Sequence, residues 1–238
     1  MNTLSSPALP SRTRLLDAAL QVIRTKGYTA TTVDEICQAA GVTKGSFFHH
    51  FKGKEDLAIQ ATLHWSDVTG AAFAAADYHR LADPRDRVLG YLDLRAVMLA
   101  GELPDFTCLL GTMVQETFST HPAIRDACNA GIDGHAHTVA VDIAEAQALY
   151  VPDATWDAQE LALYTQAALQ GAFVLAKAQG GAHIASVCVA HLRAYVQALL
   201  TPGAAVALAA PVAPGRIDPR PVHVPVPVPV PSNQGDTP

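Results

Sequence analysis

Residues 32–57 read TVDEICQAAGVTKGSFFHHFKGKEDL, and this stretch decides how the beginning of the chain folds. Thr32 precedes Glu35 by three residues. This spacing is typical of a capping box, in which each side chain bonds the backbone N–H at the other position, so it predicts the start of a helix. Gly41 ends that helix, because glycine turns sharply without steric strain. A further short helix is expected to begin after Thr43, which supplies its cap.

A third helix precedes this stretch. Apolar residues recur at helical spacing from Ser11 to Lys26, and Gly27 ends the pattern. Three short helices with a glycine-containing turn between the second and third form a helix-turn-helix pattern, which is typical of proteins that enter the DNA major groove. Phe47 and Phe51 are four residues apart, so they share one face of the last helix and are expected to bury it.

The opposite face of that last helix carries small and basic side chains, which leave room for phosphates and base edges. Other candidates lie near helix N-termini, where backbone N–H groups favour a phosphate oxygen. The candidate DNA contacts are Thr32, Thr43, Lys44, Gly45, Ser46, Phe48, His49, His50, Lys52 and Lys54. The alternative is a solvated basic face that touches nothing. Residues 11–60 carry seven Lys and Arg against five Asp and Glu, whereas the rest of the chain is acidic, which favours an anionic partner for this segment.

The segment TRLLDAALQVIRTKGYTATTVDEICQAAGVTKGSFFHHFKGKEDLA, residues 13–58, resembles the DNA-binding module of the tetracycline-repressor (TetR) family. The run GVTKGSFFHHFKGKEDL is its most diagnostic part. The resemblance implies an all-α homodimer in which one helix of each motif enters the major groove and a ligand-binding and dimerisation body follows. It places these residues at DNA bases or phosphates: Thr32, Lys44, Gly45, Ser46, His50 and Lys54. Phe48 departs from the family, which commonly has Tyr there, so a phosphate-directed hydroxyl is missing.

Composition supports a mainly helical protein with a sizeable core. Alanine, the best helix former, accounts for 43 of the 238 residues, half of the residues are hydrophobic and 16% are charged. No apolar stretch reaches the roughly 18–20 residues that a bilayer requires, and the N-terminus lacks the pattern of a secretory signal. Four widely spaced cysteines without a CxxC pair favour a reducing, cytoplasmic location.

The fold class predicted is all-α, with a three-helix DNA-binding domain followed by a body of about six helices. The expected divisions are a disordered arm over 1–10, the helix-turn-helix domain over 11–60, the effector-binding and dimerisation domain over 61–201, and a disordered Pro/Ala/Val-rich tail over 202–238. Helices after the motif are expected over 54–78, 83–101, 105–119, 121–150, 157–179 and 182–200. The helix over 121–150 carries Gly131 and Gly134, where it could kink.

The last two helices carry apolar and small residues at i, i+3 and i+4, which would let them pair with their symmetry mates as a four-helix dimer interface. The candidate interface residues are Tyr164, Ala168, Gly171, Leu175, Ile184, Cys188, His191 and Tyr195. The alternative is that both faces pack only within their own subunit. The resemblance favours the dimer, and one motif alone makes few contacts with an operator.

The segment over 105–119 predicts a binding pocket, because a polar line of Cys108, Thr112 and Glu116 runs beside apolar neighbours. Such a line suits a mostly hydrophobic ligand fixed by a few hydrogen bonds. The candidate pocket residues are Trp65, Phe73, Tyr91, Met98, Cys108, Thr112, Met113 and Glu116. Each could instead be ordinary core, and Cys108 could be either a redox or electrophile sensor or an inert buried thiol.

No cofactor, metal or catalytic site is predicted. His135 and His137 would lie about 200° apart on one helix, so they cannot share a metal unless the helix breaks at Gly134. The function predicted is a one-component transcriptional regulator, a repressor that binds a palindromic operator in double-stranded DNA as a homodimer and is released by a small-molecule effector. One alternative is an effector-independent DNA-binding dimer that only dimerises or recruits another protein. The other is a helical enzyme, for which no nucleophile–base pair or carboxylate pair emerges.

Overall fold

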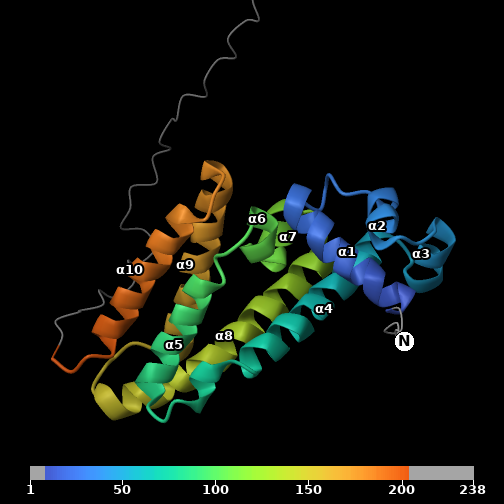
Figure 1. Cartoon of the computed structure of the whole chain (residues 1–238). Helices are drawn as coiled ribbons and strands as arrows, with labels where there is room; N and C mark the ends of the chain where they lie inside the picture. The colour runs from blue at the N-terminus through green and yellow to red at the C-terminus, as the bar shows by residue number, and fades with distance from the viewer. Residues whose placement is uncertain (1–8, 204–238) are drawn as a thin grey trace, which may run out of the picture. The chain divides into compact units, whose positions relative to one another are not determined.

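The computed structural model describes residues 9–203, and every regular element in that range is a helix (Figure 1). The first half contains α1 (Ser11–Lys26), α2 (Val33–Ala40), α3 (Lys44–His50), α4 (Lys54–Ala74), the 3-10 helix η1 (Asp77–Arg80) and α5 (Pro84–Val97). The second half contains α6 (Leu103–Phe106), α7 (Leu109–Thr117), α8 (Pro122–Tyr150), α9 (Ala158–Gln179) and α10 (His183–Leu199). The expected all-α fold is confirmed.

The caps read from the sequence form as expected. The Thr32 hydroxyl accepts the Glu35 N–H at 3.3 Å, and the Glu35 carboxylate accepts the Thr32 N–H at 2.9 Å. Gly41 ends α2 in the left-handed region with φ 61°, and Arg14 of α1 donates to its carbonyl at 2.7 Å. These bonds fix the turn between α2 and α3 and tie it to α1. Thr43 caps α3 by accepting the Ser46 N–H at 3.2 Å.

The helix-turn-helix motif and the body share one of two hydrophobic cores. Phe47 and Phe51 are buried among apolar residues of α1, α2 and α4, as the sequence predicts. The same core also takes in Leu109 and Met113 of α7 and Ile124 of α8. The boundary predicted at residue 60 therefore does not separate two independent cores.

The second core holds the body together, and α4 contributes to both. It gathers buried residues of α5, α8, α9 and α10 around Tyr91, Leu92 and Phe173. The first half of α4 packs into the N-terminal core through Leu57, whereas Phe73 near its end belongs to the second core. One continuous helix thus connects the helix-turn-helix motif with the interior of the body (Figure 1).

The helix predicted over 105–119 is wrong, because the chain forms two helices there. Pro104 stands in the first turn of α6, and Thr107 and Cys108 are extended, with φ near −80° and ψ of 152° and 128°. Thr107 is buried, and its backbone is extended at the junction between α6 and α7. Cys108 consequently stands at the N-cap position of α7, one residue before the helix that carries Thr112 and Glu116.

Two other predicted helices end earlier than expected. α4 ends at Ala74, because η1 turns back and seats Tyr78 against α5, where a Cβ on Gly90 would lie 2.7 Å from the Tyr78 Cβ. α5 ends at Val97, and Gly101 turns with φ 89° before α6 begins. These ends are set by packing between distant segments, which helical periodicity does not report.

α8 is a single helix through Gly131 and Gly134. A Cβ on Gly131 would lie 2.7 Å from Leu110 of α7 and 2.8 Å from Ser66 of α4, so this glycine allows the three helices to approach closely. Among the described helices none is both long and apolar enough to cross a membrane. The arm and tail predicted at 1–10 and 202–238 lie almost entirely outside the described residues.

Candidate functional site

The outer face of α3 is open to solvent, as the candidate DNA contacts require. Phe48 is 59% exposed, and its ring stands edge-on to the buried ring of Phe47 with the centroids 5.1 Å apart. Lys44, Gly45 and His49 are also exposed, and Ser46 is half-buried. A Cβ on Gly45 would meet only the Thr43 hydroxyl, at 3.7 Å, so nothing inside the chain requires a glycine there.

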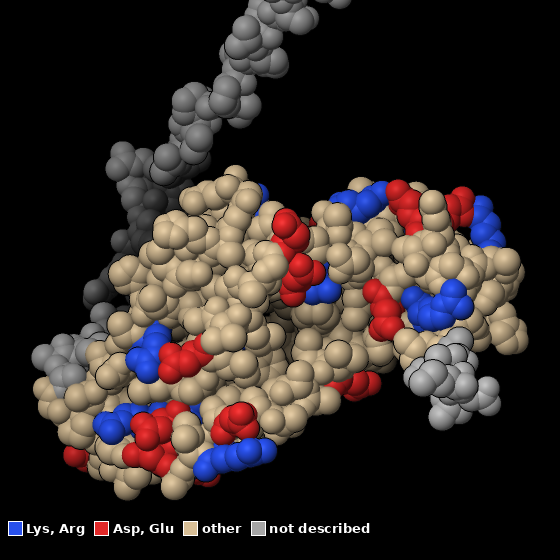
Figure 2. All heavy atoms as spheres, viewed as in Figure 1, with Lys and Arg blue, Asp and Glu red and all other residues tan. Residues whose placement is uncertain are grey.

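Charged groups beside this face already have partners of their own. Lys44 pairs with Asp34 at 2.7 Å, but both side chains are more than 60% exposed, so the pair is worth little and a phosphate can compete for the lysine. His50 shares a 2.7 Å hydrogen bond with the Ser11 hydroxyl at the start of α1. Figure 2 shows basic and acidic side chains beside one another over α1, α2 and α3, so the surface seen there is no uniform basic patch.

Lys54 has a different role in the structure from the predicted phosphate contact. Its ammonium donates to the carbonyls of Tyr28, Thr29 and Thr31 at 3.0, 3.3 and 2.9 Å, and it lies 4.3 Å from the centroid of the Tyr28 ring. An ammonium has three hydrogens, and all three are used. Burial lowers the pKa of Lys54, which Glu116 partly offsets. Lys54 therefore ties the loop between α1 and α2 to the start of α4.

Glu116 of α7 holds the same loop from the side of the body. Its carboxylate accepts the Thr29 N–H at 2.7 Å. A Cβ on Gly27 would lie 2.2 Å from the Glu116 carboxylate, and Gly27 has φ 90°, so the loop and α7 approach closely only because of this glycine. The Tyr28 ring meets the ring of His121 at 5.4 Å, next to the start of α8. The loop thus connects α4 and the body to the DNA-binding motif.

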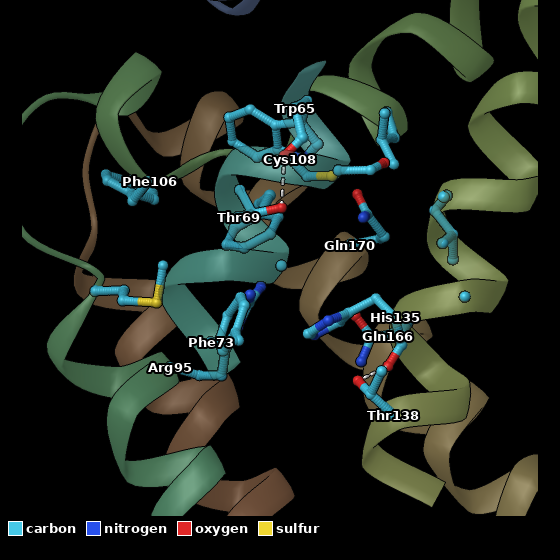
Figure 3. Close-up of a pocket in the computed structure, with 18 of the residues that line it drawn as sticks. Trp65, Thr69, Phe73, Arg95, Phe106, Cys108, His135, Thr138, Gln166 and Gln170 are labelled. Atoms are coloured by element: carbon cyan, nitrogen blue, oxygen red, sulfur yellow. Dashed lines mark hydrogen bonds between the residues drawn. The ribbon is translucent and has the colours of Figure 1, made fainter. Parts of the chain in front are cut away.

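A cavity of about 540 Å³ lies within the body, between α4, α5, α6, α8 and α9 (Figure 3). This volume is in the range of sites for small organic molecules. Aromatic rings form much of its wall, from Trp65 and Phe73 of α4, Phe106 of α6 and Phe173 of α9. The polar groups that line it include Thr69, Asp105, Arg95, His135, Thr138, Gln166 and Gln170.

His135 and Gln166 form the polar wall across the cavity from Arg95 (Figure 3), and a chain of hydrogen bonds behind that wall fixes them. Gln166 donates to the Tyr91 hydroxyl at 3.1 Å and to the Thr165 hydroxyl at 2.9 Å. The Tyr91 hydroxyl also shares a 3.1 Å hydrogen bond with Nε2 of His135. Burial, with a smaller contribution from Arg95, lowers the pKa of His135 to about 4. The ring is therefore neutral at pH 7.

Four of the predicted pocket residues line this cavity, namely Trp65, Phe73, Met98 and Cys108. Tyr91 is buried behind the wall, where it orients His135 and Gln166. Met113 instead belongs to the N-terminal core and is fully buried. The polar stripe of α7 faces a separate hollow of about 190 Å³, which Cys108 also lines. Thr112 and Glu116 line that hollow, and Lys177 donates to the Thr112 hydroxyl there at 2.7 Å.

Several cavity residues have no distinguishing signal in the sequence. Arg95 lies on α5 like any amphipathic surface arginine, and the two glutamines of α9 lie on a face that the seam pattern alone does not separate from core. The sequence raises His135 only as a candidate metal ligand. A neutral polar residue within an alanine-rich helix, such as Gln166, is the one signal the sequence offers, and it does not indicate what that residue faces.

An open, shallow groove runs along α9 and α10, and seven of the eight predicted interface residues line it. They are Tyr164, Ala168, Gly171, Leu175, Cys188, His191 and Tyr195. Ile184 packs beside the second core instead. Tyr164 and Leu175 are 49% and 44% exposed, and a Cβ on Gly171 would meet nothing within 4 Å. In Figure 2 the surface over α9 and α10 is mostly uncharged.

The histidines and cysteines do not assemble into a metal site in the part of the chain that the structure describes, where no group of three or more His, Cys, Asp or Glu could hold an ion. Burial raises the pKa of Cys37, and it raises that of Cys128 to about 12, so both thiols are inert. Cys108 is half-buried between the cavity and the smaller hollow.

Comparison with known proteins identifies the class. Residues 15–61 match the family described as bacterial regulatory proteins, tetR family, and residues 84–184 match the C-terminal domain of transcriptional regulators similar to LmrA and YxaF. A helix-turn-helix motif continuous with a helical body containing a cavity is the architecture of a DNA-binding regulator. The chain belongs to the TetR family of transcriptional regulators.

Curated relatives match mainly through the DNA-binding motif. The chain is 35% identical to the transcriptional regulator UidR of Escherichia coli K12 over 63 residues, which cover 26% of this chain and 32% of that protein. It is 27% identical to the regulator LmrA of Bacillus subtilis over 120 residues, covering 50% of this chain and 63% of that protein. The chain thus spans about a third of the length of the first of these relatives.

Solved structures match over most of the described chain. The regulatory protein TetR from Rhodobacter sphaeroides superimposes with a TM-score of 0.70 at 24% identity, covering 78% of this chain and 98% of that one. A TetR transcriptional regulator from Chloroflexus aurantiacus gives a TM-score of 0.67 at 26% identity, covering 79% and 94%. The fold of the body is therefore that of the family, although its sequence has diverged.

Proposed function

We propose that this chain is a ligand-responsive repressor that binds a palindromic DNA operator as a homodimer and is released by a small molecule in the 540 Å³ cavity. The proposed activity involves no chemical reaction. The observation that carries it is the course of α4, which starts beside α3, contributes Leu57 to the core of the motif and lines the cavity with Trp65, Thr69 and Phe73. Whatever fills the cavity acts directly on the helix that carries the motif.

The proposed DNA contact is the outer face of α3. Lys44 and His49 would meet phosphates or base edges, Ser46 would read a base, and Gly45 would allow the backbone to approach. Phe48 supplies an apolar ring that can pack on sugar or a thymine methyl group. Thr32, Thr43 and Lys52 flank this face and remain candidates for phosphate contacts. Lys54 is not placed among these contacts, because its ammonium donates to the backbone of the loop between α1 and α2.

A dimer through the α9–α10 groove would supply the second motif. The groove is apolar and open, and α9 and α10 contain small residues that permit close approach between helices. Gly171 stands there with open space around it, although glycine lowers helix stability at such a position, which a partner helix would explain. Two copies joined in this way would present two α3 helices to the two halves of a palindrome.

The proposed release mechanism is a shift between two arrangements of the motifs. A ligand that favours the arrangement with the wrong spacing for the half-sites lowers operator affinity by its preference for that arrangement. A 100-fold release corresponds to about 2.7 kcal/mol of coupling. The coupling between the cavity and the motif would pass through α4 and through the loop between α1 and α2 that Lys54 and Glu116 hold, since both connect body and motif.

The proposal is tested by selecting binding sites from a random duplex library with the purified chain. We expect a palindromic consensus whose half-sites are about one or more helical turns apart. A small-molecule screen for release of that complex follows. The variant Gly70→Met places a side chain in the cavity, because Gly70 lines it and its Cβ would meet nothing within 4 Å. We expect it to bind the operator and to be insensitive to the releasing compound.

Gly181→Met is the matched control, since Gly181 also has open space around its Cβ but lies outside the cavity. It is expected to remain sensitive. Selection that yields no preferred sequence would overturn the proposal. A specific operator complex that no compound releases would instead favour the effector-independent DNA-binding dimer.

A further inference from the structure

We propose that the cavity selects a monoanionic aromatic ligand, such as an aryl carboxylate, with Arg95 as its anchor. This inference rests on the proposed function only in treating the cavity as a ligand site; it adds the charge and the shape of the ligand. The observation behind it is a half-buried guanidinium in an aromatic-walled cavity, without an acidic partner in the described part of the chain.

The surroundings of Arg95 leave its charge uncompensated. Its guanidinium carbon lies 5.4 Å from the ring centroid of Phe73 and 5.9 Å from that of Phe173. Among residues 9–203 no hydrogen bond or ion pair to this guanidinium is formed, whereas Arg87 and Arg193 each pair with a carboxylate. Ring faces attract a cation only weakly, and a partly desolvated guanidinium favours a bidentate anion.

The other charged group of the lining does not neutralise Arg95. Asp105 is exposed, and its carboxylate accepts the Glu102 N–H at 2.8 Å as part of the cap of α6. It also lies near Arg24, whose charge it stabilises. His135 is neutral, and its Nε2 is already engaged by the Tyr91 hydroxyl. Among the described residues that line the cavity, Arg95 is thus the one Lys or Arg, and the one Asp or Glu, Asp105, is bonded to the cap of α6.

The walls of the cavity determine which features the rest of the ligand should have. Phe73 and Phe173 present ring surfaces near the guanidinium, and the centroid of the Phe106 ring lies 6.3 Å from that of Phe173. Trp65 lines the cavity about two turns before Phe73 on α4 (Figure 3). Such walls favour a flat, apolar body. Thr69, Thr138 and Gln170 add neutral hydrogen-bonding groups beyond it. One guanidinium favours one negative charge, because Arg95 is the one Lys or Arg among the described lining residues and would not meet the second charge of a dianion such as a phosphate monoester.

The experiment compares matched pairs of probes that differ in charge but hardly in shape. We use benzoate and benzamide, 2-naphthoate and 2-naphthamide, and biphenyl-4-carboxylate and its amide. Binding to the full chain is measured by calorimetry and by quenching of Trp65 fluorescence in a Trp156→Phe background. We expect at least one carboxylate to bind ten times or more tightly than its own amide.

Arg95→Gln should abolish that preference, leaving the carboxylate no tighter than the amide, while affinity for the amide changes little. Arg85→Gln is the matched control, since Arg85 also lies on α5 and over a ring, that of Tyr150 at 4.1 Å, but outside the cavity. It should keep the preference. Circular dichroism and thermal unfolding of both variants verify that a lost preference does not reflect lost folding.

Two outcomes overturn the inference: no carboxylate in the panel exceeding its amide, or a preference that survives Arg95→Gln. Neither outcome tests DNA binding, so neither bears on the proposed repressor function. A releasing compound that proves neutral or cationic and binds in the cavity would leave the proposed repressor function intact and refute the charge assignment. Conversely, a chain without any preferred DNA sequence that still selects carboxylates through Arg95 would refute the repressor and support the ligand class.

Discussion

Two glycines of the helix-turn-helix motif, Gly41 and Gly45, differ in whether the folded chain itself requires them. Gly45 stands in the first turn of α3 with an ordinary backbone conformation and free space around it. Gly41, by contrast, is required by its φ of 61°. Nothing in the described chain requires a glycine at position 45, whereas the turn requires one at position 41. We therefore infer that Gly45 is there for contact with a partner.

Replacing Gly45 by alanine should therefore stabilise the chain and impair DNA binding. We expect the free energy of unfolding to rise by about 0.5 kcal/mol, because alanine is the better helix former. We expect operator affinity to fall, because the added methyl group holds the backbone away from the DNA. Chemical denaturation and a gel-shift titration measure the two effects. Unchanged affinity would place the DNA surface elsewhere.

His135 predicts a pH dependence of stability. Its pKa in the folded chain is about 4, mainly because burial disfavours the charged ring, with Arg95 adding to the effect. The ring of the unfolded chain has its ordinary pKa of 6.5. Between pH 6.5 and pH 4 the unfolded state binds more protons, so stability falls as the pH falls through this window. The loss from this residue is on the order of 3 kcal/mol at most.

His135→Gln should flatten that part of the stability profile, because a glutamine amide does not titrate in this range and can still hydrogen-bond the Tyr91 hydroxyl. His137→Gln is the control, because His137 is exposed on the same helix two residues later. Urea unfolding at a series of pH values gives the slopes. A profile of His135→Gln as steep as that of the unaltered chain would mean that other groups cause the acid sensitivity.

At the scale of helices and loops, the junction between motif and body depends on a few polar bonds around one loop. Lys54 from α4 and Glu116 from α7 both bond the backbone of the segment between α1 and α2. Neither side chain is free for a ligand or a phosphate in this structure. Their arrangement makes the loop a connection between α4, α7 and the motif, so its loss should affect stability first.

Lys54→Met should lower the free energy of unfolding by about 1–3 kcal/mol, because three carbonyls lose their donor. The dependence of operator affinity on salt should keep its slope, since no phosphate contact is removed. Lys52→Met is the comparison, because Lys52 is exposed beside α3 and its loss should reduce the slope by about one. A reduced slope for Lys54→Met would restore the phosphate contact predicted from the sequence.

The α9–α10 groove makes a separate prediction about assembly. Leu175→Glu puts a charge into the proposed interface of both copies and should raise the dimer dissociation constant at least about 100-fold. Val97→Glu is the control, because Val97 is 74% exposed on α5 and lies outside the groove. Sedimentation velocity over a range of concentrations measures both. Equal behaviour of the two variants would place the interface on another surface.

At the scale of the whole described chain, the motif and the cavity are connected by packing and so should be linked thermodynamically. The first core extends from α1 into α7 and α8, and α4 runs from that core to the cavity wall. Linkage is reciprocal, so a compound that weakens operator binding by some factor must itself bind the operator complex more weakly by the same factor.

We expect the two factors to agree within error, each between about 5-fold and 150-fold. Operator affinity is measured with and without saturating compound, and compound affinity with and without operator. In Gly70→Met both factors should approach one. A compound that dissociates the complex without reciprocal weakening acts by competing for DNA and not through the cavity.

Much of the motif could be predicted from local sequence. The capping box at Thr32 and Glu35, the turn at Gly41 and the buried pair Phe47 and Phe51 depend on residues close together in the chain. The i, i+3 and i+4 pattern of apolar and small residues in α9 and α10 likewise predicts the surface on which the groove lies. Local backbone preferences and helical spacing are decided by neighbours in sequence, so such features can be read without a tertiary structure.

The cavity and the junction were decided by contacts across the chain. Thr112 and Glu116 line the smaller hollow and not the cavity, and the packing of α5 against α8 and α10 places Arg95 beside Phe73 and Phe173 in the cavity wall. The three carbonyls around Lys54 are offered by a loop more than 20 residues earlier. By itself the sequence determined a helical DNA-binding motif on a helical body. Only tertiary packing decided which side chains share the cavity, because burial and charge compensation depend on residues far apart in the chain.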